Sequence, residues 1–164
     1  MTKPKAQLID PHEQGQRRLD LKKPVFDGDA VARAEGAVQA LSGSFQSWLK
    51  EEIAKVQAAR VAADEAGWAP SALTPLCMAA HDLKGLGATY ECPLATQIAA
   101  SLSRLIETED GKQQAQRDPS LARAHVDALR AIVRVGVNSD EDPVGRALLR
   151  ELEARVADLG VAPR

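Results

Sequence analysis

Apolar residues spaced three and four positions apart, in segments separated by proline and glycine, most constrain what this chain can fold into. Such spacing places apolar side chains on one face of an α-helix. It predicts six helices, which begin near residues 29, 44, 70, 93, 118 and 143. Gly43 is predicted to end the first helix, Ser44 to cap the second, and the polar stretch 109–118 to break off the fourth.

Three of these segments carry apolar stripes that matter for the site. The stripe of the third predicted helix consists of Leu73, Leu76, Ala80, Leu83, Gly87 and Tyr90. That of the fifth consists of Leu121, His125, Ala128, Ile132 and Val135. That of the sixth consists of Leu148, Leu149, Leu152, Val156 and Leu159. An aspartate followed by proline, at 118–119 and at 142–143, is predicted to begin each of these last two helices.

Short connections between amphipathic helices of this length predict an antiparallel bundle. Aromatic residues make up only 3% of the chain, which leaves strands little to pack with, so the expected fold class is all-α. Residues 1–26 hold three prolines and no sustained periodicity, and are expected to form a flexible or surface-wrapping tail. Residues 27–164 are expected to form one helical domain, with the bundle core at about 44–137 and an extra C-terminal helix at 143–160.

The charges and cysteines exclude several classes of protein. Lysine and arginine (21) nearly balance aspartate and glutamate (23), so nucleic acid and anionic membranes are not expected partners. No apolar run approaches the roughly 20 residues that cross a bilayer, and no export signal is visible, so a soluble, cytoplasmic protein is expected. Cys77 and Cys92 form no C-x-x-C pair, which argues against a disulfide framework or a zinc cage.

The three histidines have different predicted surroundings. His81 lies about 130° around the helix from the centre of its apolar stripe, so its ring should face water. His125 lies on its own helix's apolar stripe and should be at least partly buried and hydrogen-bonded. His12 belongs to the tail and has no such context. Among the histidines, His81 is therefore the candidate for chemistry.

The neighbours of His81 on the predicted outward face are small or deformable. Cys77, Gly85 and Ala88 are small, and they leave the ring accessible to another protein. Met78 offers a partner an unbranched, adaptable apolar contact.

A cation and a glycine stand at helical spacing from His81. Lys84 lies one turn further along, where its ammonium can neutralise a phosphoryl group carried by the imidazole. Gly85 lies directly beside His81 on the helix surface, where any side chain would obstruct an incoming active site. A glycine inside a helix destabilises it by about 1 kcal/mol relative to alanine. Gly87 falls on the apolar stripe and can be explained by close helix packing, whereas Gly85 cannot.

The segment AAHDLKGLGATYECPLATQIAASLSRLIE resembles the signature of histidine phosphotransfer (HPt) domains, whose pattern is H-x-x-K-G on the second helix of an antiparallel four-helix bundle. His81, Lys84 and Gly85 match this pattern position for position, and with the surrounding bundle the resemblance covers about residues 44–137. The chain departs from the family after the motif. Leu86 stands where many members have serine or alanine, and residues 90–92 stand where many have a glycine.

The resemblance implies a phosphoryl carrier, not an enzyme. His81 would accept the phosphoryl group, Lys84 would stabilise it, and Gly85 would give steric access. Partner docking would involve Cys77, Met78, Asp82 and Ala88. The implied partners are the receiver domain of a hybrid histidine kinase and the receiver domain of a response regulator. No intrinsic cofactor is expected, because the receiver would supply Mg²⁺, and no G-x-x-x-x-G-K-[ST] loop for ATP is present.

Two other hypotheses for the function stay open. The chain could be a helical module that binds or inhibits a kinase or receiver without accepting phosphate. Alternatively, His81 and Asp82 form a literal HD pair of the kind found in metal-dependent phosphohydrolases. That chemistry needs further histidine and aspartate ligands on neighbouring helices, and the remaining histidines are poorly placed to supply them.

Overall fold

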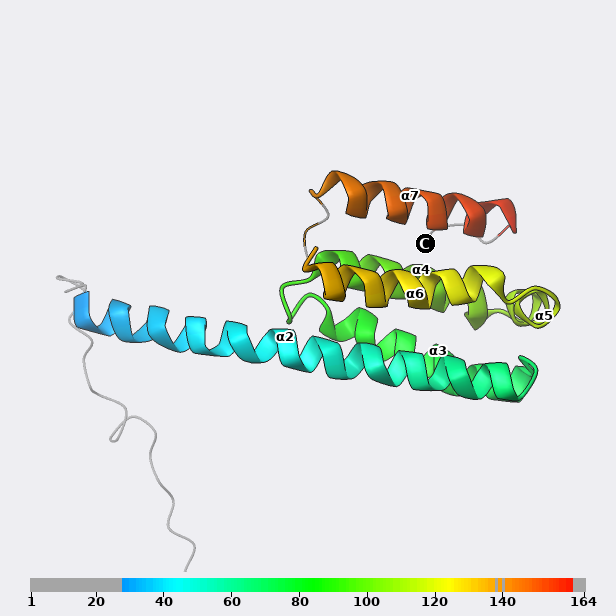
Figure 1. Ribbon diagram of the computed structural model, residues 1–164, viewed down its shortest axis with the longest axis horizontal. Helices are drawn as coiled ribbons and strands as arrows, with labels where there is room; N and C mark the ends of the chain where they lie inside the picture. The colour runs from blue at the N-terminus through cyan, green and yellow to red at the C-terminus, as the bar shows by residue number, and fades with distance from the viewer. Residues whose placement is uncertain (1–27, 138, 140, 161–164) are drawn as a thin grey trace, which may run out of the picture. The chain divides into compact units, whose positions relative to one another are not determined.

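The structure, a computed structural model, describes residues 28–137, 139 and 141–160. The predicted tail at 1–26, with His12, lies outside these residues. The described part is helical and contains no strand. Its helices are α2 (Gly28–Glu65), α3 (Pro70–Leu86), α4 (Pro93–Glu107), α5 (Glu109–Arg117), α6 (Ser120–Val135) and α7 (Pro143–Asp158) (Figure 1). The all-α prediction is thus confirmed for these residues. None of these helices has the length and apolar character needed to span a membrane.

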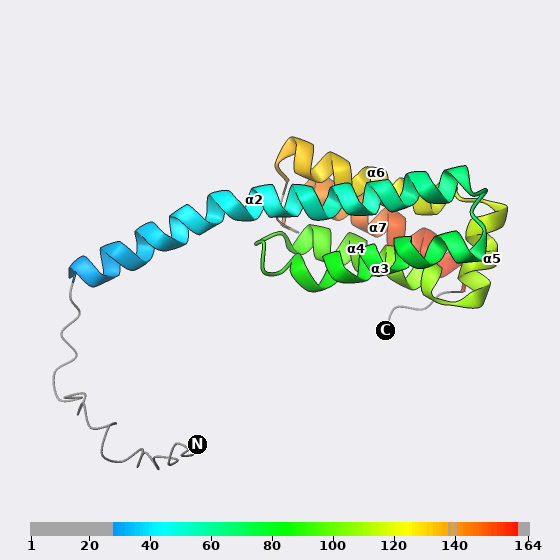
Figure 2. The ribbon, with the colours of Figure 1, turned by 90° about the horizontal axis from the view of Figure 1, so that it is seen from below.

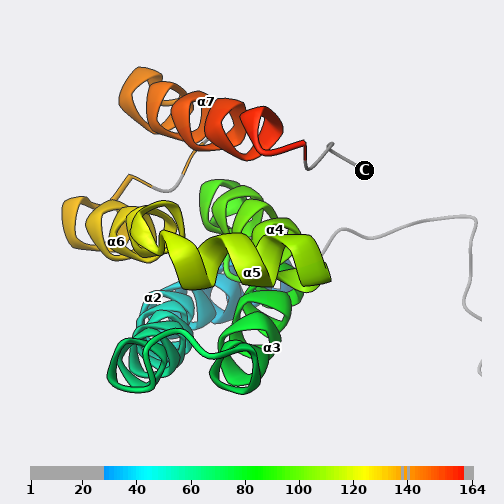
Figure 3. The ribbon, with the colours of Figure 1, turned by 90° about the vertical axis from the view of Figure 1, so that its right-hand side faces the viewer.

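The chain divides into two compact units, residues 1–37 and 38–164. The site and the core described below belong to the second unit. Within it, the later part of α2 and the following α3 run side by side in opposite directions, as two perpendicular views show (Figures 1 and 2). Viewed end-on, α4 lies among α3, α5, α6 and α7, and it contacts all four (Figure 3).

The first two predicted helices are in fact one. Gly43 does not end a helix, because α2 continues through it to Glu65. Helix propagation is cooperative, so the roughly 1 kcal/mol lost at a glycine is smaller than the loss from breaking the ladder of backbone hydrogen bonds.

The polar stretch after α4 also differs from the prediction, because it forms α5. Thr108 is its N-cap and accepts a hydrogen bond from the Gly111 N–H at 3.1 Å. Glu109 and Asp110 in the first turn favour the positive end of the helix dipole. The buried residues of α5 are only Gly111 and Ala115, so it lacks the apolar stripe by which a helix is recognised in sequence.

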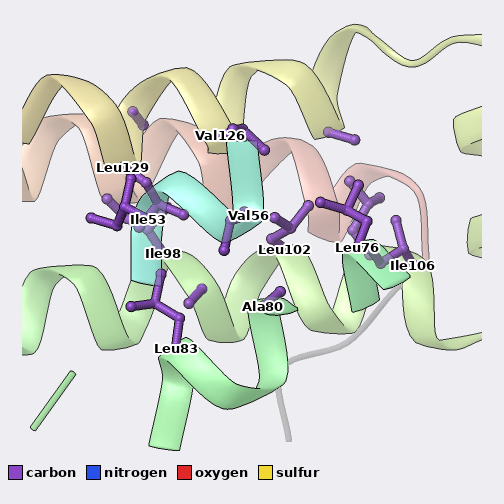
Figure 4. Close-up of a cluster of buried hydrophobic side chains, with 14 of the residues drawn as sticks. Ile53, Val56, Leu76, Ala80, Leu83, Ile98, Leu102, Ile106, Val126 and Leu129 are labelled. Atoms are coloured by element: carbon purple, nitrogen blue, oxygen red, sulfur yellow. The ribbon is translucent and has the colours of Figure 1, made fainter. Parts of the chain in front are cut away.

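The core is a single cluster of buried apolar side chains to which α2, α3, α4 and α6 contribute the largest share (Figure 4). Each fully buried leucine or isoleucine contributes about 1.5–3 kcal/mol through removal from water. The side chains labelled in the figure are Ile53, Val56, Leu76, Ala80, Leu83, Ile98, Leu102, Ile106, Val126 and Leu129.

Helix α7 packs on α4 and α6. Asp142 caps it as predicted, accepting from the backbone N–H groups of Val144 (2.8 Å) and Gly145 (3.0 Å). An ion pair between Arg104 and Glu153, at 3.2 Å, links it to α4. Only part of its predicted stripe is buried.

The stripe predictions fail at helix ends. In α7, Leu152 and Val156 are buried, Leu148 and Leu149 are half-buried, and Leu159 is exposed. In α6, Val135 is 70% exposed because the helix ends beside it, at Gly136 in the left-handed conformation (φ 79°). Asp118 accepts from the Ser120 N–H at 3.0 Å, and α6 begins at Ser120.

A polar cluster holds the turn between α2 and α3 against α6. Asp64 accepts hydrogen bonds from Arg60 Nη1 (2.6 Å), Trp68 Nε1 (2.8 Å) and Arg123 Nε (2.8 Å). Burial acts to raise the pKa of Asp64, but these donors outweigh it and hold the pKa below its ordinary value. Because Arg123 belongs to α6, the cluster joins the end of α2 and the turn that follows it to α6.

Candidate functional site

His81 is exposed, as its position on the predicted helix required. Helix α3 begins with Pro70, which suits a first turn, and buries Leu73, Leu76, Ala80 and Leu83 against the core. His81 directly follows Ala80 and is therefore turned about 100° away from it around the helix. The packing of α3 thus sets the direction of the ring.

The surface around His81 is open. Asp82, Lys84 and Ala88 are exposed, and Met78 is 63% exposed. A Cβ atom added at Gly85 would meet nothing within 4 Å. Within the described residues no carboxylate forms an ion pair with Lys84, so its ammonium has no competing partner there. A bulky group could therefore approach His81 along this face.

Gly87, two residues on, has a different role. A Cβ atom there would overlap Thr96 Oγ1 and lie 3.0 Å from the Thr96 backbone nitrogen. Gly87 is buried, is the C-cap of α3 and has helical dihedral angles, so it serves the close approach of α3 to α4. The expectation that Gly87 permits helix contact, and that Gly85 has no packing role, is confirmed.

Cys77 is less open than predicted. Its side chain is half-buried and packs against the core. Burial and the nearby charge of Glu107 raise the pKa of this thiol, so it stays protonated near neutral pH. Cys77 therefore belongs mainly to the contact between α3 and α4, and only its outer edge can contribute to the open face.

The turn after α3 carries an aromatic cluster that the helical stripes did not reveal. Tyr90, predicted to lie on the helix, instead lies in this turn, because α3 ends at Leu86. Its ring centroid is 6.2 Å from that of Phe45 and 6.2 Å from that of Trp48, both on α2. Glu91 adopts a left-handed conformation (φ 54°) within the same turn. Three aromatic rings thus pack where the chain leaves α3.

His125 is buried, as predicted, and lies between α6 and α4. Its Nδ1 is 2.8 Å from the Leu121 carbonyl oxygen, so Nδ1 carries the proton and donates it. Nε2 is 3.0 Å from Ser101 Oγ and accepts from that hydroxyl. Burial, reinforced by the charge of Arg104, lowers the pKa of His125 to about 4. His125 is therefore neutral and fully hydrogen-bonded at neutral pH, which suits a structural role.

The HD pair, His81 and Asp82, lies on the exposed face of α3. Within residues 28–137, 139 and 141–160, no three histidine, cysteine, aspartate or glutamate side chains are grouped so that they could hold a metal ion. His81 and Asp82 thus stand without the neighbouring ligands that HD-type chemistry uses, as far as the described residues extend.

Comparison of the chain with protein-family models, with curated proteins and with solved structures finds no match. The function must therefore be argued from the residues around His81.

Proposed function

We propose that this chain is a histidine phosphotransfer protein, in which His81 carries a phosphoryl group between the aspartates of two receiver domains. The observation that carries the proposal is the open face of α3. An exposed imidazole is followed one turn later by an exposed lysine, and beside it lies a glycine at which an added Cβ atom would meet nothing within 4 Å. No packing requirement of the described fold explains these three residues together.

The arrangement of helices supports the proposal. We infer that the later part of α2, with α3, α4 and α6, makes up an antiparallel four-helix bundle of the HPt type, to which α5 and α7 are added. In that family the H-x-x-K-G motif lies on the second bundle helix, which here is α3. All four helices contribute to the single buried core, so the carrier histidine would stand on a rigid support.

The chemistry requires little machinery from the carrier. A neutral ring nitrogen of His81 attacks the phosphorus of a receiver's aspartyl phosphate in line, an N–P bond forms, and the P–O bond to the aspartate breaks. The aspartate leaves as a carboxylate, and the reverse reaction loads the next receiver. Such transfer depends on positioning and charge neutralisation, and the receiver supplies the Mg²⁺ when it docks.

Lys84 has a specific electrostatic task in this scheme. A phosphoryl group on His81 would bring negative charge to this surface. Lys84 lies one turn further along and has no ion-pair partner among the described residues, so its charge can offset that of the phosphoryl oxygens. The side chain is exposed, which leaves it free to reach a group on His81.

The partners are the receiver domain of a hybrid histidine kinase and that of a response regulator, both cytoplasmic, and Met78, Asp82 and Ala88 form the docking face with the outer edge of Cys77. A module that binds a receiver without accepting phosphate would use the same face. Only a transfer assay separates that alternative from the carrier.

The test is phosphotransfer to the full chain from phosphorylated receiver domains of hybrid kinases. We expect a label on the wild-type chain that is stable to alkali and labile to acid, as phosphohistidine is. His81→Gln should lose the label completely and keep the wild-type circular dichroism spectrum, because His81 has no packing role. The matched control His12→Gln should keep the label.

Two outcomes would overturn the carrier function. One is a label retained by His81→Gln. The other is tight receiver binding by a wild-type chain that never becomes labelled, which would favour the non-phosphorylated module.

The same assay measures the contribution of Lys84. Lys84→Ala should slow transfer about tenfold, which corresponds to one charge-assisted hydrogen bond of about 1.4 kcal/mol. Lys84→Arg should recover part of the rate, and Lys50→Ala, which removes an exposed lysine from α2, should leave it unchanged. An unchanged rate in Lys84→Ala would remove Lys84 from the mechanism.

A further inference from the structure

The early part of α2 in the second unit presents an exposed apolar stripe, which consists of Val38, Leu41, Phe45 and Trp48. Val38 is 58% exposed, Leu41 48% and Trp48 41%, while Phe45 is half-buried. The spacing of three, four and three residues is that of the a and d positions of a coiled coil. The stripe therefore has the form of a surface that packs against another helix.

The charge pattern of α2 separates this stripe from ordinary exposed helix. Residues 38–49 contain no aspartate, glutamate, lysine or arginine, whereas residues 50–65 of the same helix contain seven. Loss of charge together with enrichment in aromatic residues is the compositional signal of the centre of a protein interface. The second half of α2 has the charged surface expected of a helix in contact with water.

The same pattern indicates the partner. Nucleic acid and anionic membranes are bound through lysine and arginine, and residues 38–49 have neither. A charged peptide would need opposite charges, which are also missing. A second copy of this chain brings an identical uncharged stripe, so two copies meet with no like-charge repulsion. We propose that residues 38–48 of α2 pack against the same residues of a second copy and form a symmetric dimer.

The aromatic cluster of Phe45, Trp48 and Tyr90 holds Trp48 in place before a second copy binds. The Trp48 ring lies 5.7 Å from Phe45 and 6.2 Å from Tyr90, centroid to centroid. These contacts hold the indole on the surface of the unit while 41% of Trp48 remains exposed. A tryptophan ordered before binding loses little conformational freedom when the partner covers it.

This inference does not depend on phosphotransfer. The stripe lies on α2, whereas His81, Lys84 and Gly85 lie on α3. A dimer without phosphotransfer, or phosphotransfer by a monomer, would each contradict one proposal and leave the other standing.

The first test is sedimentation equilibrium of the full chain over a range of concentrations. We expect the average mass to rise from 17.5 kDa towards twice that value. Leu41→Glu should raise the dimer dissociation constant about 100-fold, because each copy then brings a charge into the uncharged interface. The matched control Val135→Glu also places a charge at an exposed valine (70%), but on α6, and should leave the dissociation constant unchanged.

Three results would overturn the dimer. The first is a chain that stays at 17.5 kDa up to millimolar concentration. The second is an equal change of association in Leu41→Glu and Val135→Glu. The third is a monomeric chain that binds anionic lipid vesicles through the stripe, which would replace a second copy with a membrane surface.

A second measurement uses the fluorescence of the two tryptophans of the wild-type chain, Trp48 and Trp68. Trp68 is 3% exposed, so acrylamide should quench mainly Trp48. The quenchable fraction should fall as the protein concentration rises and Trp48 becomes covered, and Trp48→Phe should remove this change. A quenchable fraction independent of concentration would contradict the proposal.

Discussion

Histidine and glycine occur both on the outer face of α3 and at the seams, the contacts of α3 and α6 with α4, but their surroundings are opposite in the two regions. In the seams, His125 is buried with both ring nitrogens hydrogen-bonded, and Gly87 allows α4 to approach. On the outer face, His81 is exposed and Gly85 has nothing within 4 Å of an added Cβ. The fold explains the first pair completely and gives no reason for the second pair.

This difference teaches which residues to assign to function. A buried histidine with a carbonyl and a hydroxyl as partners satisfies the general rule that buried polar groups are paired. An open glycine inside a helix destabilises the fold by about 1 kcal/mol without a compensating contact. Openness alone does not assign a function, because Gly36 is equally open, but Gly85 lies beside the exposed His81 and Lys84, and the proposed docking of a receiver would use the space there.

The largest effect expected from this comparison is acid destabilisation through His125. Its pKa is about 4 in the folded chain and about 6.5 when unfolded, so the unfolded state binds the proton more readily. Stability from this group is therefore complete above pH 6.5, falls as the pH drops towards 4, and changes little below that. The loss should reach about 3 kcal/mol, which urea unfolding at pH 7, 6, 5 and 4 would measure.

The control for this pH dependence is His125→Gln, which removes the titrating group. Its unfolding free energy should be lower than the wild-type value at pH 7 and nearly flat between pH 6.5 and 4. Asp64, whose pKa is lowered, loses its contribution mainly below pH 4, so it affects only the acid end of this range. A steep slope retained by His125→Gln would show that another group causes the destabilisation, and the contrast between the two histidines would lose its energetic basis.

The next effect distinguishes the inner glycine. Gly87→Ala should destabilise the chain by about 2 kcal/mol, since the new methyl group would overlap Thr96 Oγ1 and crowd the Thr96 backbone. Urea unfolding at pH 7 measures the change. Adding Thr96→Ser to Gly87→Ala should not restore the stability, because serine keeps the side-chain oxygen that the new methyl group would overlap. If the Gly87→Ala chain is as stable as the wild type, α4 can shift to accommodate the methyl group at little cost, and Gly85 and Gly87 would then not differ in packing.

Much of the packing of the helices, and of the exposure of the outer face of α3, could be predicted from the sequence, because both follow from helical periodicity. The buried face of α3, the exposure of His81, the burial of His125 and the different surroundings of Gly85 and Gly87 all follow from about 100° of rotation per residue. The misses have other causes. Helix α5 has almost no apolar stripe, the helix through Gly43 depends on cooperativity, and Val135 lies at a helix end where the stripe no longer faces the core.

The candidate site was predictable only in part. The spacing of His81, Lys84 and Gly85 lies within one helix, so local geometry was sufficient. The partial burial of Cys77 against the core depends on how α3 packs on its neighbours, and no local pattern indicates it. The cluster of Phe45, Trp48 and Tyr90 likewise depends on the turn after α3, whose course could not be read from a helical stripe.

The smallest effect is the sharpest test, because Gly85→Ala should move stability and function in opposite directions. The chain has space for the methyl group, and alanine favours the helix, so the unfolding free energy should rise by about 0.7 kcal/mol. The rate of phosphotransfer to the unaltered His81 should fall, because the methyl group occupies the space through which a receiver approaches. Gly36→Ala is the matched control, since Gly36 also lies in a helix and an added Cβ atom there would meet nothing within 4 Å. It should change the unfolding free energy similarly without affecting the rate of transfer. If Gly85→Ala transfers as fast as the wild type, the open space beside His81 has no role in docking, and the outer face would keep only the imidazole and Lys84 as arguments for its function.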